Sequence, residues 1–362
     1  MKHLLPVVIA LTLFASLSAA AQDGVKYTEA ADLTLVGNLF PDTPNPYHRL
    51  DTAKYKGFEK KDLTVIVQSS GLSVAFKTDS KSITILTEYG YRRFGNFSPG
   101  LALRGYDLYI KQDGKWLWAS SGTPDDKHPD TPLNLIQNMD GSMHECLLYL
   151  PLYSEERSVK IGVEEGSTIA AIPIPFRHRV GIFGSSFTHG GGTTRSGLTY
   201  PAIFTRDTGI QLLSLGVSGR SKLQPAFARA LADADVEAYI FDAFSNPSLD
   251  QIRKYLFPFI ETIQAKHPDI PLIFLRSIYR ENRNFKMDKR KSEEDRMALV
   301  EEMMKEACKK YKNVYFVTST NATSPEHDTT VDGTHPGDYG YFLWARSIEK
   351  PVLKILRKYG IK

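Results

Sequence analysis

From residue 180 to the C-terminus, short apolar runs alternate with longer helical segments, and this alternation is the strongest constraint on the fold. Runs this short and this apolar are typical of strands that are buried on both faces. Strand and helix in alternation favour a parallel sheet with right-handed crossover connections. The predicted strands are 180–183, 212–215, 239–241, 272–275 and 314–317, and the predicted helices are 200–205, 223–233, 249–265, 292–310 and 339–357.

The first half of the chain has a different pattern, in which short alternating segments are separated by turn residues. Their length and β-branched content predict the strands of an all-β sandwich or jelly-roll-like domain. The hairpin over 106–118 is the strongest local case, since Asp113-Gly114 suits a tight turn. Other predicted strands are 63–67, 72–76, 82–86 and 158–163. Prolines near residue 175 mark the boundary, so we expect a β-sandwich domain over 22–175 and an α/β domain over 176–362.

The composition is typical of a folded globular protein and gives no sign of a nucleic-acid partner. The 362 residues are 42% hydrophobic and 24% charged, which allows about two domains with cores of their own. The 45 basic and 41 acidic residues leave a formal charge of +4, too small and too dispersed for a nucleic-acid binder. The oligomeric state stays open.

Residues 1–21 resemble a secretory signal peptide, with a basic start, an apolar centre over 4–17 and small residues up to Ala21. The alternative, a membrane anchor, needs about 20 apolar residues, and no later segment is apolar enough either. We therefore expect export to the periplasm or the exterior, without stable membrane insertion. Export would permit a disulfide between Cys146 and Cys308, but two separate buried thiols fit better, because free cysteine is usually buried.

Polar and glycine-rich loops follow the predicted strands of the second half, where the functional groups of a parallel sheet gather. The first loop, 184–192, has the sequence GSSFTHGGG and exposes Ser186 at a strand-to-helix turn. It lacks the final glycine of the G-x-S-x-G elbow and the lysine of a phosphate-binding loop. The later loops are GVSGRS at 216–221, FSNP at 244–247 and DGTHP at 332–336.

These four segments, in this order, resemble the four sequence blocks of the SGNH hydrolases, the superfamily that includes the GDSL esterases. In the first half, the sequence GYDLY at 105–109 matches the G-x-D-L-Y signature of a β-rich domain that precedes one SGNH subfamily of secreted bacterial esterases. The resemblance implies a flavodoxin-like, three-layer α/β/α catalytic domain after an all-β domain. It also implies a carboxylic ester hydrolase that needs no cofactor.

By position, the resemblance assigns Ser186 as the nucleophile, His335 as its general base and Asp332 as the residue that orients His335. A serine hydroxyl needs such a base, and a carboxylate three residues away can fix the imidazole tautomer. The backbone amides of Ser186 and Gly219 and the side-chain amide of Asn246 would form the oxyanion hole.

The sequence departs from the common pattern at several positions. Ser185 replaces the aspartate of the G-D-S core, and Phe244 and Pro247 replace the residues that often flank the block-three asparagine. His189 lies near Ser186 in sequence, but without an acid nearby it is expected at the pocket edge or behind the site. For Asp107 we expect a structural role at the domain junction. The histidines show no metal-ligand spacing, so no metal is expected.

The leading hypothesis is a secreted serine esterase that removes a short acyl group, most simply acetyl, from carbohydrate. Export, the β-rich domain and the resemblance favour a glycan over a lipid. One alternative is a lipid-directed acyl hydrolase such as a lysophospholipase or thioesterase. A further alternative is a glycan-binding protein without catalysis, against which the joint presence of Ser186, Asp332 and His335 argues.

Overall fold

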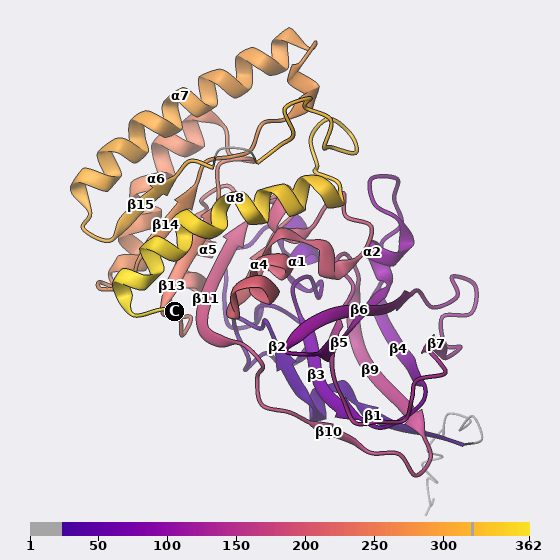
Figure 1. Ribbon diagram of the computed structural model, residues 1–362. Coiled ribbons are helices and arrows are strands. Elements are labelled where there is room, and N and C mark those ends of the chain that lie inside the picture. The colour runs from indigo at the N-terminus through magenta and orange to yellow at the C-terminus, as the bar shows by residue number, and fades with distance from the viewer. Residues whose placement is uncertain (1–23, 320–321) are drawn as a thin grey trace, which may run out of the picture.

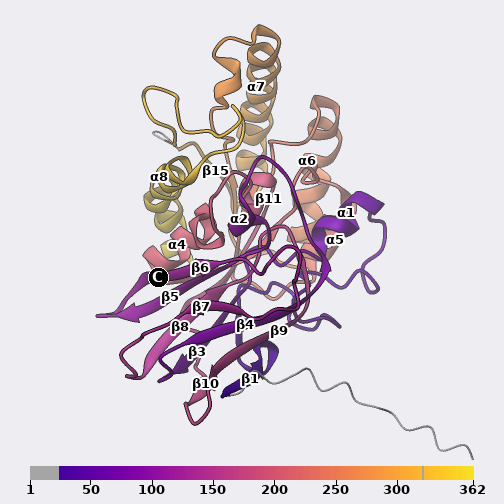
Figure 2. The same cartoon turned by 90° about the vertical axis from the view of Figure 1, so that its right-hand side faces the viewer.

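The computed structural model describes residues 24–319 and 322–362 and has a β-rich end and a helical end (Figure 1, Figure 2). In both views the strands of the N-terminal half gather at the lower end, and the long helix α7 (Met287–Lys310) lies at the upper end. The expected signal peptide, residues 1–21, lies outside the described residues.

Two antiparallel sheets form the β-rich half, as the alternating pattern predicted. One has the order β1-β9-β4-β7, and the other has the order β10-β3-β8-β5-β6 with β2 paired to β3. On β3, Val74 and Phe76 face the core between the sheets, and Ala75 faces the opposite side. The strands are β1 (Val25–Glu29), β2 (Thr34–Val36), β3 (Ser73–Thr78), β4 (Ile83–Tyr91), β5 (Tyr106–Gln112), β6 (Lys115–Gly122), β7 (Leu133–Ile136), β8 (His144–Tyr149), β9 (Glu155–Glu164) and β10 (Ile169–Ala171).

The predicted hairpin is present, and one predicted strand is wrong. Asp113 and Gly114 both have positive φ, at 50° and 76°, which is the turn geometry that matches strand twist. Residues 63–67, predicted as a strand, instead fall in or beside helix α1 (Lys60–Ile66). A capping box at its start, in which the Asp62 carboxylate accepts the Glu59 backbone N–H at 2.8 Å, outweighs the β-branched content of the segment.

The second half contains a parallel sheet of the order β12-β11-β13-β14-β15, the doubly wound topology expected for a flavodoxin-like domain. Its strands are buried on both faces. On β11, for example, Val180 and Ile182 pack into one core and Phe183 into the other. The strands are β11 (Arg177–Gly184), β12 (Ile210–Gly216), β13 (Ala238–Asp242), β14 (Leu272–Leu275) and β15 (Val314–Val317).

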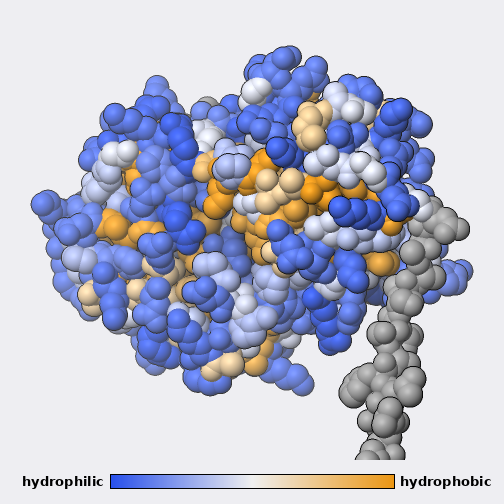
Figure 3. Space-filling view, turned by 90° about the horizontal axis from the view of Figure 1, so that it is seen from below, coloured by the Kyte–Doolittle hydropathy of each residue, from blue (hydrophilic) through white to orange (hydrophobic). Residues whose placement is uncertain are grey.

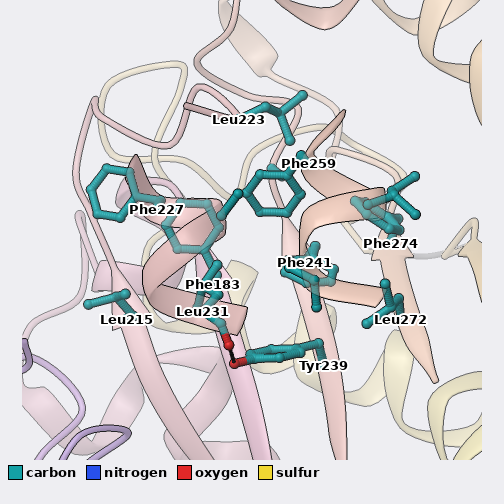
Figure 4. Packing of buried hydrophobic residues seen from close by; sticks show 14 of the residues in the cluster. Phe183, Leu215, Leu223, Phe227, Leu231, Tyr239, Phe241, Phe259, Leu272 and Phe274 are labelled. Atoms are coloured by element: carbon teal, nitrogen blue, oxygen red, sulfur yellow. Dashed lines mark hydrogen bonds between the residues drawn. The ribbon is translucent and has the colours of Figure 1, made fainter. Parts of the chain in front are cut away.

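Helices cover both faces of this sheet and complete three layers. One face packs against α5, α6 and α7, where aromatic rings such as Phe227, Phe241 and Phe259 interlock (Figure 4). In the same cluster the Tyr239 hydroxyl donates a hydrogen bond to the Leu231 carbonyl (Figure 4). The other face packs against α4 and α8. The remaining helices are α2 (Gly100–Arg104), α3 (Ser186–His189), α4 (Tyr200–Thr208), α5 (Pro225–Ala232), α6 (Leu249–Gln264) and α8 (Asp338–Leu356).

An arm of the N-terminal half, residues 37–68, packs onto the core of the α/β half. Leu39, Phe40, Leu50 and Ile66 belong to the same buried cluster as Phe183 of β11. The two halves therefore share apolar surface, and the arm that joins them contributes to the stability of the parallel sheet.

Asp107 joins the two halves through polar contacts, which is the structural role expected for it. Its buried carboxylate accepts hydrogen bonds from Arg195 Nη1 at 2.9 Å and from the Gly197 backbone N–H at 2.8 Å. Trp118 Nε1 donates to the same carboxylate at 3.1 Å. Both Arg195 and Gly197 precede α4, so this residue of the G-x-D-L-Y signature fastens β5 to the α/β half.

The two cysteines are separate thiols, as expected, but they differ in exposure. Cys146 is buried in the β-sandwich, whereas Cys308 lies on the exposed face of α7, so the expectation that both are buried is wrong for Cys308. Within the described ranges, no helix is long and apolar enough to cross a bilayer. The face seen from below in Figure 3 is mostly hydrophilic around a limited apolar patch.

Burial of Glu156 predicts a pH-dependent stability. The side chain is fully buried on β9, and burial raises the pKa of its carboxyl group to about 8, against 4.5 ordinarily. The folded protein therefore keeps a proton that the unfolded chain loses, and stability falls as the pH rises from about 4.5 to about 8. Urea unfolding should show that the free energy of unfolding of Glu156→Gln, relative to that of the wild type, rises by about 1–4 kcal/mol from pH 5 to pH 9. A difference that does not change with pH would contradict this.

Candidate active site

Ser186 lies at a sharp turn between β11 and α3. The strand ends at Gly184, and Ser185 caps the helix by accepting the Phe187 backbone N–H at 3.2 Å. The helix ends at Gly190, which adopts a left-handed conformation that glycine tolerates best. The chain thus turns tightly on both sides of Ser186, which is 7% exposed.

A buried carboxylate on β13, Asp242, supports this turn from beneath. Its Oδ2 accepts hydrogen bonds from the Ser185 hydroxyl at 2.7 Å and from the Thr188 hydroxyl at 3.1 Å. Burial raises the pKa of Asp242 to about 6, although these hydrogen bonds oppose the shift. The contact explains the departure at position 185, because an aspartate there would place two buried carboxylates against each other. Asp242 belongs to no motif and was not predicted as a site residue; its only signal in the sequence is an acidic residue at the end of an apolar strand.

The structure brings Ser186, His335 and Asp332 into one hydrogen-bonded chain. Ser186 Oγ lies 2.9 Å from His335 Nε2, and His335 Nδ1 lies 2.7 Å from Asp332 Oδ2. Asp332 Oδ1 also accepts the His335 backbone N–H at 2.7 Å. Partial burial raises the pKa of Asp332, but the hydrogen bonds from His335 outweigh it and hold that pKa below its ordinary value. An ionised Asp332 can only accept, so Nδ1 carries the proton and Nε2 is free to accept the Ser186 hydroxyl.

The glycine-rich loop after α3 packs against the turn that holds His335. Gly192 has φ +97°, and a Cβ atom there would lie 2.3 Å from the Pro336 carbonyl oxygen. The Tyr341 hydroxyl donates to the Gly191 carbonyl at 2.7 Å and fixes the loop to α8. The glycines at 190–192 therefore allow the close approach that brings Ser186 within reach of His335.

Two backbone amides, those of Ser186 and Gly219, are free to bind an anion. Gly219, in the loop after β12, has φ +70° and lines the same pocket as His335. Within the described part of the chain, the N–H groups of Ser186 and Gly219 form no hydrogen bond. Asn246 lies in the loop after β13, the strand next to β11, and its buried Oδ1 has no partner among those residues. No hydrogen bond joins Asn246 to Ser186 or His335 in the described residues.

His189 lies behind the site rather than in it. Its ring is fully buried and stacks on Tyr153, with the centroids 4.1 Å apart. His189 Nε2 donates to the Leu152 carbonyl at 2.6 Å, so Nδ1 accepts the Ser218 backbone N–H at 3.4 Å. Burial lowers the pKa of His189 well below its ordinary value, which keeps the ring neutral. This neutral histidine supports the loop that contains Gly219.

A pocket of about 470 Å³ opens beside His335, and both halves of the chain line it. Its residues are Lys61, Thr64, Val65, Gln68, Arg93, Phe97, Tyr153, Ser218, Gly219, Arg220 and His335. The seven that precede residue 175 were not predicted from the sequence, because they lie in loops and in α1 without a motif. Among the described residues, no group of three or more His, Cys, Asp or Glu side chains is placed to hold a metal ion.

Comparison with known proteins agrees with this architecture. A sequence profile of the GDSL-like lipase/acylhydrolase family matches residues 177–354, and a profile of the GxDLY N-terminus of SGNH-hydrolase-type esterases matches residues 25–169. The crystal structure of a protein from Bacteroides ovatus, described as a GDSL-like lipase, is 35% identical, with a TM-score of 0.88 over 92% of this chain and 98% of that one.

More distant structures share the fold at lower identity. The salicylyl-acyltransferase SsfX3 from a tetracycline biosynthetic pathway is 21% identical (TM-score 0.69, 94% of this chain and 97% of that one). A family two carbohydrate esterase from Cellvibrio japonicus is 10% identical (TM-score 0.60, 92% and 98%). No functionally curated protein matches the chain significantly.

The hydrogen bonds of His335 and of the buried His189 predict opposite tautomers. His335 should carry its proton on Nδ1, facing Asp332, and His189 on Nε2, facing the Leu152 carbonyl. Long-range ¹⁵N–¹H correlation spectra distinguish the two forms. Asp332→Asn should disturb the His335 pattern and leave that of His189 unchanged. A His335 ring protonated on Nε2 at neutral pH would contradict the geometry described above.

Proposed function

The chain belongs to the GDSL-like lipase/acylhydrolase family and is a carboxylic ester hydrolase, and we propose that it removes acetyl groups from carbohydrate with a catalytic triad of Ser186, His335 and Asp332. The observation that supports the proposal best is the hydrogen-bonded chain from Ser186 Oγ through the His335 ring to Asp332, beside an open pocket. The mechanism follows from the chemistry of these groups.

Acylation begins when the Ser186 hydroxyl attacks the ester carbonyl carbon and His335 Nε2 takes its proton. Asp332 keeps the proton on Nδ1 and stabilises the imidazolium that forms. The carbonyl oxygen becomes an oxyanion, for which the backbone amides of Ser186 and Gly219 and the side-chain amide of Asn246 are the proposed donors. When the tetrahedral intermediate collapses, His335 donates its proton to the departing sugar oxygen, and an acetyl-Ser186 ester remains.

Deacylation repeats these steps with water. His335 takes a proton from a water molecule, whose oxygen attacks the acetyl carbon of the acyl-enzyme. The second tetrahedral intermediate uses the same oxyanion donors. Its collapse releases acetate, and the proton on His335 returns to Ser186 Oγ. Both ring nitrogens of the buried His189 are occupied by backbone groups, so His335, which contacts Ser186 Oγ, is the histidine that performs both proton transfers.

Several features favour a sugar substrate with a small acyl group. Most residues that line the pocket are polar or charged, which suits hydroxyl groups better than a long acyl chain. Structures with the same fold include carbohydrate esterases from Cellvibrio japonicus and Clostridium thermocellum. We also propose that the protein is exported to the periplasm or the exterior, on the strength of residues 1–21, where polymeric glycans are encountered.

Ser186→Ala is the direct test of the proposed nucleophile. The rate of acetate release from acetylated polysaccharides should fall at least about 10³-fold in this variant, because alanine has no hydroxyl group that His335 could activate. Circular dichroism and thermal unfolding should match the wild type, since the change removes one oxygen atom. If wild type and variant release acetate equally, the triad proposal fails. If the wild type binds glycans but releases none, the protein is a glycan-binding protein.

A series of p-nitrophenyl esters separates the carbohydrate proposal from a lipid-directed hydrolase. The wild type should have its highest kcat/KM on acetate and lose activity as the acyl chain lengthens, because most residues that line the pocket carry polar or charged groups that a long chain would desolvate. A lysophospholipase or thioesterase would show the reverse order. Preference for long chains would therefore overturn the assignment of substrate.

Asn246 is the sharpest test of the proposed oxyanion hole. Asn246→Ala should lower kcat by about 10²–10³ with a smaller change in KM, since the donor acts on charge that develops in the transition state. Asn246→Asp, which keeps the size but removes the donor, should lose at least as much. Retention of normal kcat in both variants would exclude Asn246 from the oxyanion hole and leave the backbone amides of Ser186 and Gly219.

A further inference from the structure

The pocket beside His335 is lined by cations and by no carboxylate. Lys61, Arg93 and Arg220 contribute positive charge, and the lining residues include no Asp or Glu. Arg220 is already neutralised, because it pairs with Asp62 at 2.6 Å and with Glu59. Arg93 and Lys61 form no ion pair with any described carboxylate. Their charges are therefore available to a ligand.

A third cation, Arg49, lies beneath the pocket and has no acidic partner either. Its guanidinium is fully buried and donates hydrogen bonds to the carbonyl oxygens of Gln68 (2.6 Å), Gly216 and Val65. Gln68 and Val65 line the pocket, and Gly216 begins the loop that contains Gly219. Burial lowers the pKa of Arg49 to about 9, so its guanidinium is still protonated at neutral pH, and a buried charge paired only with carbonyl groups is costly. The field of Arg49 therefore adds to that of the two pocket cations.

The acidic groups that contact the lining residues Arg220 and His335 are occupied. Glu59 and Asp62 bind Arg220, and Asp332 binds His335. The Arg93 guanidinium lies 6.0 Å from the centre of the Phe97 ring, a cation–π contact that holds it beside this ring. Phe97 in turn lies 5.9 Å from the His335 ring, which places the cationic surface directly next to the proposed reacting centre.

From this arrangement we propose that the pocket recognises an anionic sugar, an acetylated residue whose carboxylate binds Arg93 and Lys61 in the field of Arg49. This inference rests on the proposed function, and it narrows the carbohydrate to an acidic one. The anionic group lies on the alcohol part of the ester, so it remains bound while the acetyl group is transferred to Ser186. A sulfate ester on the sugar would present the same chemistry to the same cations.

The test uses two partly acetylated oligosaccharides with the same β-1,4 backbone, one built of glucuronic acid and one of glucose. The pair differs at C6, where the first has a carboxylate. The wild type should have a kcat/KM at least about tenfold higher on the glucuronic acid compound, the scale of a charge-assisted hydrogen bond. The ratio should fall toward one at about 1 M salt, where the screening length is about 3 Å. A wild-type ratio near one at low salt would overturn the proposal.

Arg93→Gln should lower the ratio of kcat/KM on the glucuronic acid compound to kcat/KM on the glucose compound by about tenfold or more. Lys61→Gln should lower this ratio less, because an ammonium group lacks the planar fork of arginine. Arg92→Gln is the matched control. The Arg92 guanidinium lies over the rings of Tyr89 and Phe94 and does not line the pocket, so its removal should leave the ratio unchanged. Equal loss of the ratio in the Arg92 and Arg93 variants would show a general effect of charge and contradict the proposed contact.

Calorimetric binding to the Ser186→Ala variant separates this inference from the proposed function. If the wild type hydrolyses neither oligosaccharide, the acetylesterase proposal fails, yet binding of the deacetylated glucuronic acid compound but not of the glucose compound still supports the anion subsite. Absence of that difference overturns the subsite. A sulfated glucose oligosaccharide in the same assay distinguishes the two anions, since tighter binding than the carboxylate compound would assign the pocket to sulfate.

Discussion

The hydrogen bond between Ser186 Oγ and His335 Nε2 joins two loops that are 149 residues apart, and the rest of the structure makes that bond possible. One loop leaves the carboxyl end of β11, and the other precedes α8, which packs on the same parallel sheet. The close approach needs glycine at 192, where a side chain would collide with Pro336. It also needs the buried Asp242 to hold the turn at Ser185. The geometry of the site therefore depends on the packing of the surrounding fold.

The N-terminal half also contributes to the geometry of the site. Asp107 fastens β5 to the segment before α4, and the arm over 37–68 packs against the core of the parallel sheet. Within that arm, Arg49 bonds the Gly216 carbonyl at the end of β12. A change in the arm thus reaches the loop that contains Gly219, and Arg93, Phe97 and Tyr153 bring the β-rich half to the edge of the site.

Much of the fold was predictable because its signals are local. Buried strands such as 239–241, the Asp113-Gly114 turn and the serine, glycine and histidine loops depend on neighbouring residues, and they lie where the sequence indicated. Long-range features were not predictable. Residues 63–67 look like a strand until the packing of Ile66 against the core of the parallel sheet is known. Arg49, Asp242 and Arg93 belong to no motif, and their meaning depends on partners far away in the sequence.

Covalent labelling with a fluorophosphonate tests the central claim most directly, because the reagent reacts with a serine that a neighbouring base has activated. Mass spectrometry of the digested protein should find one modified serine, Ser186. Labelling should disappear in His335→Ala and slow strongly in Asp332→Ala. A label on another serine, or a His335→Ala variant that labels as fast as the wild type, would contradict the account of Ser186 as a nucleophile activated by His335.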